Sequence, residues 1–149
     1  MDRPDGLLEG EELLALLPVR FSAGTQTHIS EDQPGMVRPA VAQRFAFARW
    51  AQTSSAVGFP IAGPEMVIGI TPERLLVWRP SFVRNRPRRF AGAMALSEIR
   101  RAGIHRRVIA TVLTLMFEDG TIVAVETFRA SRLRELATSI PTYPDYRVR

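Results

Sequence analysis

The sequence predicts an α+β domain in which a meander of short antiparallel strands is closed by a C-terminal helix. Runs of β-forming residues follow one another between residues 66 and 127. The dipeptide Asp119-Gly120 separates the last two runs, and this pair is a strong signal for a two-residue hairpin. A chain of 149 residues suits a single domain over residues 1–149. After the last β-forming run, apolar residues recur at helical spacing and predict the C-terminal helix: Leu133, Leu136, Ala137 and Ile140.

Near the N-terminus we predict a strand over Leu14–Phe21. Pro18 limits the length of any helix here, and Val19 and Phe21 favour an extended backbone. A short helix remains the alternative, because four leucines between residues 13 and 17 also fit a helical stripe.

Residues 22–60 are interpreted as an insertion that holds a loop and a helix. The part from 22 to 39 is polar and rich in turn-forming residues. Pro39 suits the first position of a helix, which is predicted over Ala40–Gln52. Two faces of this helix are apolar, so we expect it to pack between surfaces. One face holds Val41, Phe45 and Ala48, and the other holds Phe47, Trp50 and Ala51.

The meander itself is predicted element by element. Pro72 presets the backbone of a turn between the first two expected strands, Met66–Ile70 and Leu75–Arg79. Residues 141–149 follow Pro141 and are predicted to be a flexible tail. The expected strands are Met66–Ile70, Leu75–Arg79, Ala93–Ile99, Val108–Phe117 and Thr121–Thr127, and the expected helix runs from Phe128 to Ile140.

Composition narrows the classes of protein that remain. The apolar content of 46% is ordinary for a globular domain. No apolar run reaches the roughly 18 residues of a transmembrane helix, and the first residues lack the order of a secretory signal. Cysteine is absent, which excludes disulfides. We therefore expect a cytoplasmic protein or one that is peripheral to the membrane.

Positive charge is concentrated in one part of the chain. All 20 basic residues are arginine, which is typical of a GC-rich genome, and the net charge is +5. Between Arg79 and Arg107 lie nine arginines and one carboxylate, Glu98, so this stretch carries +8 and the rest of the chain −3. Such a stretch is either a solvated surface that follows from genome composition or a site for an anionic partner.

Several segments together resemble bacterial pleckstrin-homology-like domains, a group close to the GRAM domains. Residues 67–78 are similar to the first hairpin of that group, 96–99 and 113–122 to later strands, and Gly10-Glu11 to its opening. The resemblance implies an antiparallel β-barrel or half-barrel of about six or seven strands, with a C-terminal capping helix and, as a departure from the pattern, an inserted helix packed on the outside. It also implies a non-enzymatic binding or adaptor module, since known members bind phosphoinositides, peptides or other proteins.

An arginine loop between two of the predicted strands is the first candidate site. Several guanidinium groups on one loop can hold phosphates, and neighbouring aromatic rings can enter a lipid interface or stack on bases. Four interpretations remain open: a solvated loop, an anionic lipid surface, nucleic acid, or an acidic protein partner. The anion-binding candidates are Arg84, Arg86, Arg88 and Arg89, and the possible interfacial aromatics are Trp78, Phe82 and Phe90.

A second basic cluster is predicted in the next connection. Successive connections of a meander alternate between the two ends of a sheet, so the two clusters are not expected to share a face. Its members are Arg100, Arg101, His105, Arg106 and Arg107.

The sequence carries no pattern that predicts catalysis, a cofactor or a metal. His28 with Glu31 and Asp32 lies in a polar loop without a second nearby histidine, which is a poor metal site. Residues 58–63 have the glycine spacing of a phosphate loop, but Pro64-Glu65 replaces the required lysine and hydroxyl residue. Ser54 and Ser55 lack the setting of a nucleophile.

The function expected from the sequence is therefore a non-enzymatic binding module with an unknown protein partner. Binding of anionic lipid through the arginine loop over residues 79–90, or of nucleic acid, are the alternatives.

Overall fold

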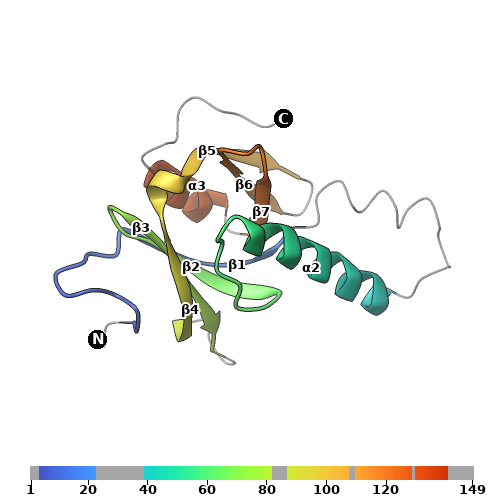
Figure 1. Ribbon diagram of the computed structural model, residues 1–149, viewed down its shortest axis with the longest axis horizontal. Helices are drawn as coiled ribbons and strands as arrows, with labels where there is room; N and C mark the ends of the chain where they lie inside the picture. The colour runs from blue at the N-terminus through green and yellow to red at the C-terminus, as the bar shows by residue number, and fades with distance from the viewer. Residues whose placement is uncertain (1–3, 23–38, 82–86, 108–109, 129, 141–149) are drawn as a thin grey trace.

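The computed structural model describes residues 4–22, 39–81, 87–107, 110–128 and 130–140. Seven strands and two helices lie in this part of the chain (Figure 1). In chain order the elements are β1 (Ala15–Phe21), α2 (Pro39–Ala56), β2 (Glu65–Ile70), β3 (Arg74–Pro80), β4 (Pro87–Ala95), a 3-10 turn (Leu96–Glu98), β5 (Ile99–Arg106), β6 (Thr111–Phe117), β7 (Ile122–Thr127) and α3 (Ala130–Thr138).

The strands form one antiparallel sheet in the order β4-β3-β2-β1-β7-β6-β5. The sheet is open, and β4 and β5 are its two edges. The closed barrel among our expectations is therefore wrong, whereas the α+β class is confirmed. Closure would need a ladder between β4 and β5. The 3-10 turn joins these strands in sequence, but they are not hydrogen-bonded neighbours.

The predicted strand over Ala93–Ile99 is the main error in the element assignment. This segment contains the end of β4, the 3-10 turn and the first residue of β5. The prediction missed β5, because basic residues interrupt its apolar pattern and because Ala102 and Gly103 are of residue types that are depleted in strands. Its pairing with β6 reveals the pattern, since Ala102 and Ile104 lie opposite the buried Leu115 and Leu113.

Helix α3 covers one face of the sheet. Its four predicted core residues are all buried, and the helix contacts β1, β5 and β6. They belong to the same apolar core as Leu17 of β1 and Leu113 of β6. The hairpin before α3 has the expected tight turn, because Gly120 has φ +88° and its N–H donates to the Phe117 carbonyl over 3.0 Å. Its loop is one residue longer than the expected two, since the Phe117 N–H donates to the Thr121 carbonyl over 2.9 Å, and glycine at positive φ is typical of the third position of such a loop.

Helix α2 is attached to the sheet through one of its two apolar faces. Trp50 is buried, and its Nε1–H donates to the Ala124 carbonyl of β7 over 2.9 Å. The ring of Trp50 also contacts Phe21 and Phe59, with centroids 5.9 Å away in each case. Phe45, on the other apolar face, is exposed, so the helix is not packed between two surfaces as we expected. Figure 1 shows its N-terminal part extending away from the sheet.

Residues 4–14, which we call the N-terminal strap, cover the opposite face of β2 and β3. Leu7 and Leu13 pack there against a second apolar cluster of Val67, Leu76 and Trp78. The indole Nε1–H of Trp78 donates to the Asp5 carbonyl over 2.6 Å. The strap thus gives this half of the sheet two buried faces.

Candidate binding surface

Only part of the predicted arginine loop lies in the described residues. Arg84, Arg86 and Phe82 fall outside them. Arg88 and Arg89 begin β4 and are exposed, and Arg89 pairs across the ladder with the exposed Arg79 of β3. Two like charges directly opposite one another repel, so an anion bound between Arg79 and Arg89 would relieve a local cost.

The other two predicted interfacial aromatics are not free to enter an interface. Trp78 is 0% exposed beneath the N-terminal strap. Phe90 is half-buried, with its ring centroid 6.1 Å from that of Trp78. Gly6 lies so close to this ring that a Cβ at its position would overlap the ring of Phe90. Both rings therefore hold the strap on the sheet. The strap shields these apolar rings from water, and this burial favours the covered arrangement.

The second basic cluster lies in a strand and not in a connection. Arg100 and Arg101 are near the start of β5, where Arg100 Nη1 lies 3.8 Å from Glu118 Oε1. Arg106 ends the strand, and Arg107 follows it. Arg88 and Arg89 of the first group thus lie on one edge strand of the sheet, β4, and Arg100, Arg101 and Arg106 of the second group lie on the other, β5.

The junction between β1 and β7 is short, and Pro18 explains why. The Ser22 N–H donates to Ala124 of β7, whereas the Phe21 N–H donates to Pro64, ahead of β2. Successive residues of β1 thus face alternate neighbours, and the even-numbered ones face β7. The pairs between β1 and β7 are Arg20 with Glu126 and Phe21 with Val125. The next position facing β7 is Pro18, which has no N–H to donate, so the ladder ends there.

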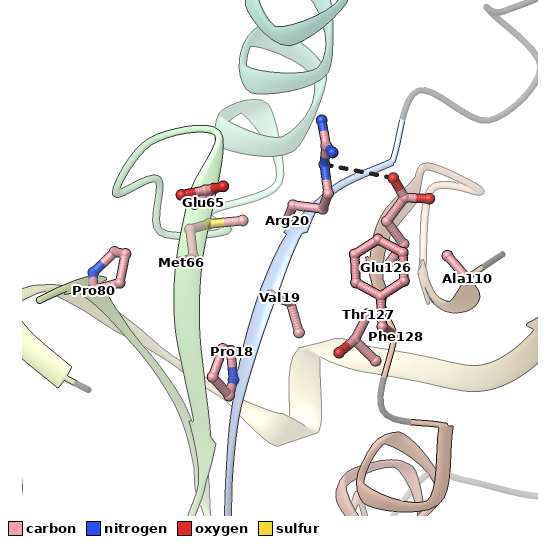
Figure 2. Close-up of a pocket in the computed structure, with 10 residues that line it drawn as sticks. All are labelled: Pro18, Val19, Arg20, Glu65, Met66, Pro80, Ala110, Glu126, Thr127 and Phe128. Carbon is pink, nitrogen blue, oxygen red and sulfur yellow. Dashed lines mark ion pairs between the residues drawn. The ribbon is translucent and has the colours of Figure 1, made fainter. Parts of the chain in front are cut away.

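Where the ladder ends, Phe128 lines two adjoining hollows in the surface. Figure 2 shows the residues that line one of them. Phe128 follows β7 and is 72% exposed. We call the two depressions together the Phe128 basin, since they share Arg20, Ala110, Glu126 and Phe128. The apolar hollow is lined in addition by Pro18, Val19, Glu65, Met66, Pro80 and Thr127. The basic hollow is lined in addition by His105, Arg106 and Arg107.

One row of cross-strand neighbours crosses the basin. Arg20 of β1 pairs with Glu126 of β7, Glu126 with Val112 of β6, and Val112 with His105 of β5. Figure 2 shows Arg20 and Glu126 pointing toward one another, with Arg20 Nε 3.6 Å from Glu126 Oε1. That distance is too long for a hydrogen bond. The two opposite charges therefore attract one another, but the Arg20 Nε–H is left without a hydrogen-bond acceptor.

Two polar atoms of the basic hollow have no hydrogen-bond partner. Within the described segments, four buried side-chain nitrogen or oxygen atoms lack one, and two of these are Arg20 Nε and His105 Nδ1. A buried polar group without a partner costs about 1–3 kcal/mol. Two of the four thus belong to side chains that line the basic hollow, where a polar group of a partner could pair with them.

Comparison with known proteins adds no family to this description. No family model matches the chain. A search of curated proteins finds no similar sequence either.

The residues weighed for metal binding and catalysis are placed as follows. His28, Glu31 and Asp32 lie outside the described residues. Ser54 and Ser55 lie in the last turn of α2, and Ser55 Oγ donates to the Gln52 carbonyl over 3.2 Å. In the part of the chain that the structure describes, no group of three or more His, Asp or Glu side chains could hold a metal ion, and no helix is long and apolar enough to cross a membrane.

Sequence reasoning missed the Phe128 basin. Its signals were Pro18 within a strand, which marks a place where a ladder stops, and the basic end of β5. Phe128 was expected to begin the C-terminal helix, but it lies in a bend before α3.

Proposed function

We propose that this chain is a non-enzymatic binding or adaptor module that takes a segment of a partner protein in the Phe128 basin. The observation that carries this proposal is the interrupted ladder between β1 and β7, which leaves an exposed aromatic ring between two hollows. Aromatic residues and arginine are both enriched at the surfaces where proteins bind one another.

The size of the apolar hollow supports a side chain as its occupant. Its volume is about 290 Å³, at the lower limit of pockets that enclose a drug-sized ligand. A single apolar side chain fits this space more readily than a whole cofactor does. The strand content and the helix after β7 agree with what the pleckstrin-homology-like resemblance implies, and that resemblance includes peptide and protein ligands among its expectations.

The proposal is tested by selecting from a random peptide library on the immobilised full chain. Peptides enriched on the wild type are then measured against Phe128→Ala, and we expect their affinity to fall by about tenfold or more because a central aromatic contact is lost. Phe128 is exposed, so the variant should keep the wild-type melting temperature.

The matched control is the double variant Arg88→Ser and Arg89→Ser, which removes exposed charge from the other edge strand. It should bind the selected peptides as the wild type does. The proposal fails if no peptide is enriched above background, or if the enriched peptides bind Phe128→Ala unchanged.

A second candidate function is favoured by the facing pair Arg79 and Arg89 with Arg88 beside it. These three guanidinium groups could dock an anionic lipid surface, with about 1 kcal/mol per arginine at low salt. Vesicles with and without anionic lipid, tested against a variant with all three changed to serine, decide this alternative. Equal binding of wild type and variant would exclude it.

A further inference from the structure

The two halves of the Phe128 basin differ in charge. The basic hollow is lined by Arg20, Arg106 and Arg107 against one carboxylate, Glu126, and by His105. It carries +2 with neutral histidine. The apolar hollow has Arg20 against Glu65 and Glu126, and its other lining residues are uncharged. An anionic group is thus favoured in the basic hollow and disfavoured in the apolar hollow, whose net charge is −1. In the apolar hollow, Pro18, Met66 and Pro80 offer contacts to an apolar group.

The carboxylates of the basin restrict where an anion can sit. Glu126 lies 3.6 Å from Arg20 and already offsets its charge. Arg106 and Arg107 are exposed at the end of β5, and neither forms an ion pair with a carboxylate of the described part of the chain. The strongest attraction for a carboxylate is therefore at Arg106 and Arg107, next to His105, whose Nδ1 has no partner.

The spacing of the strands sets the distance between the anionic group, which lies beside His105 of β5, and the apolar group, which lies beside β1. His105 and Arg20 lie in one cross-strand row with two strands between them. Strands are about 4.8 Å apart, so the ends of this row are separated by about 14 Å. An extended peptide advances about 3.3 Å per residue, and residues four apart point to the same side. Such a pair spans the row.

Resting on the proposed function, we infer that the partner segment is an extended acidic peptide in which an apolar side chain lies about four residues from a carboxylate. The carboxylate binds at Arg106 and Arg107 beside His105. The apolar side chain lies against Phe128 in the apolar hollow, near Pro18 and Met66. Complementary charge gives the segment its direction across the basin.

The test uses fluorescein-labelled glycine–serine peptides of about ten residues and the full chain, with binding followed by fluorescence anisotropy at low salt. One peptide carries two adjacent glutamates and a leucine four positions away, in either order. Its controls replace the glutamates by glutamine, replace the leucine by serine, or place the leucine next to the glutamates. We expect the spaced acidic peptide to bind about tenfold more tightly than each control.

Protein variants locate the binding. Arg106→Ser with Arg107→Ser should weaken the acidic peptide about tenfold and leave the glutamine peptide unchanged, whereas Arg88→Ser with Arg89→Ser should have no effect. Arg106 and Arg107 are exposed, and equal melting temperatures verify that the variants are folded.

Other outcomes overturn the inference. It fails if the glutamine peptide binds as well as the acidic one, or if the loss at Arg106 and Arg107 is seen only with a labelled single-stranded oligonucleotide or anionic vesicles. Library peptides that need Phe128 but carry no acidic residue would refute the acidic partner and leave the proposed function standing.

Discussion

Glu11 attaches the N-terminal strap to the turn between β2 and β3, because its carboxylate accepts four hydrogen bonds. Its Oε2 accepts from Arg74 Nε over 2.8 Å and from the Thr71 hydroxyl over 3.0 Å, while Oε1 accepts from Arg74 Nη2 and from the Leu8 N–H. The hydrogen bonds from Arg74 are the main reason that the pKa of Glu11 falls from 4.5 to about 2. Both side chains are mostly buried, so water screens the pair only partly.

This shift predicts a pH-dependent contribution to stability. Because the folded-state pKa is below the unfolded value, the contribution is complete above about pH 4.5 and is lost as the pH falls toward 2. Glu11→Gln should lower the free energy of unfolding by about 1–3 kcal/mol at pH 7. Urea unfolding of both proteins between pH 7 and pH 2.5 measures the difference. A gap that stays constant across this range would show that the Glu11 carboxylate does not hold the strap.

Gly69 of β2 allows the strap to pack closely on the sheet, because glycine has no Cβ atom. A Cβ built on it would meet the Trp78 ring at 2.7 Å and Leu13 Cδ1 at 2.9 Å. Gly69→Ala should therefore displace the strap, cost about 1–3 kcal/mol and shift tryptophan fluorescence to longer wavelength. The control is Gly120→Ala, where a Cβ meets nothing within 4 Å and only the positive φ is strained. It should lose about 1 kcal/mol without a fluorescence shift. Identical spectra for both variants would contradict this account.

At the scale of elements, α3 is the helix that closes the core. Leu136 is buried, whereas Arg134 of the same helix is exposed. We expect Leu136→Ala to lower the free energy of unfolding by about 2–4 kcal/mol, because it removes a core side chain and leaves a cavity. Arg134→Ala should change it by less than about 0.5 kcal/mol. Thermal unfolding measures both, and a melting temperature unchanged in Leu136→Ala would mean that α3 does not pack as described.

The elements that sequence reasoning found are those with local signals. The stripe from Leu133 to Ile140 and the turn at Asp119-Gly120 are both determined within a few residues. The Asp119 carboxylate accepts the Thr121 N–H over 2.9 Å, which lowers the pKa of this aspartate and stabilises the turn. Strand β5 was missed because its basic residues and Gly103 hide the alternation, and because part of its burial comes from α3, which begins more than 20 residues later in the chain.

The candidate site was less predictable than the fold. Charge alone pointed to the four arginines between residues 84 and 89, of which the structure describes Arg88 and Arg89. The Phe128 basin depends on which strand lies beside Pro18, and that neighbour is β7, more than 100 residues later in the chain. No local pattern carries such a pairing, so Arg20 and His105 could not be brought together from the sequence.

At the scale of the whole molecule, the two halves of the sheet share few ladder contacts but one core. Strands β1–β4 and β5–β7 meet at the pairs between β1 and β7. The main apolar cluster nevertheless includes Ile68 and Val77 from one half together with Leu115 and Val123 from the other. A shared core couples the halves more strongly than the short ladder does, because burial of apolar surface is the dominant favourable term in folding.

This arrangement predicts a single cooperative unfolding transition. Trp50 reports on α2 and β7, and Trp78 on the strap side of β3. The fluorescence of Trp50→Phe and Trp78→Phe variants should each follow the same urea midpoint as their own circular dichroism. Two separate midpoints within one variant would show that the halves unfold independently.

The proline in β1 also has an evolutionary consequence. Because Pro18 alone withholds a donor from β7, a substitution such as Pro18→Val would let the ladder lengthen toward Phe128 and narrow the opening. The added backbone bond would favour the folded state, while the surface available to a partner would shrink. Selection for thermal robustness and selection for binding would then act in opposite directions at this one codon. Variants evolved for heat resistance alone are therefore expected to lose this proline, and those selected on a ligand to keep it.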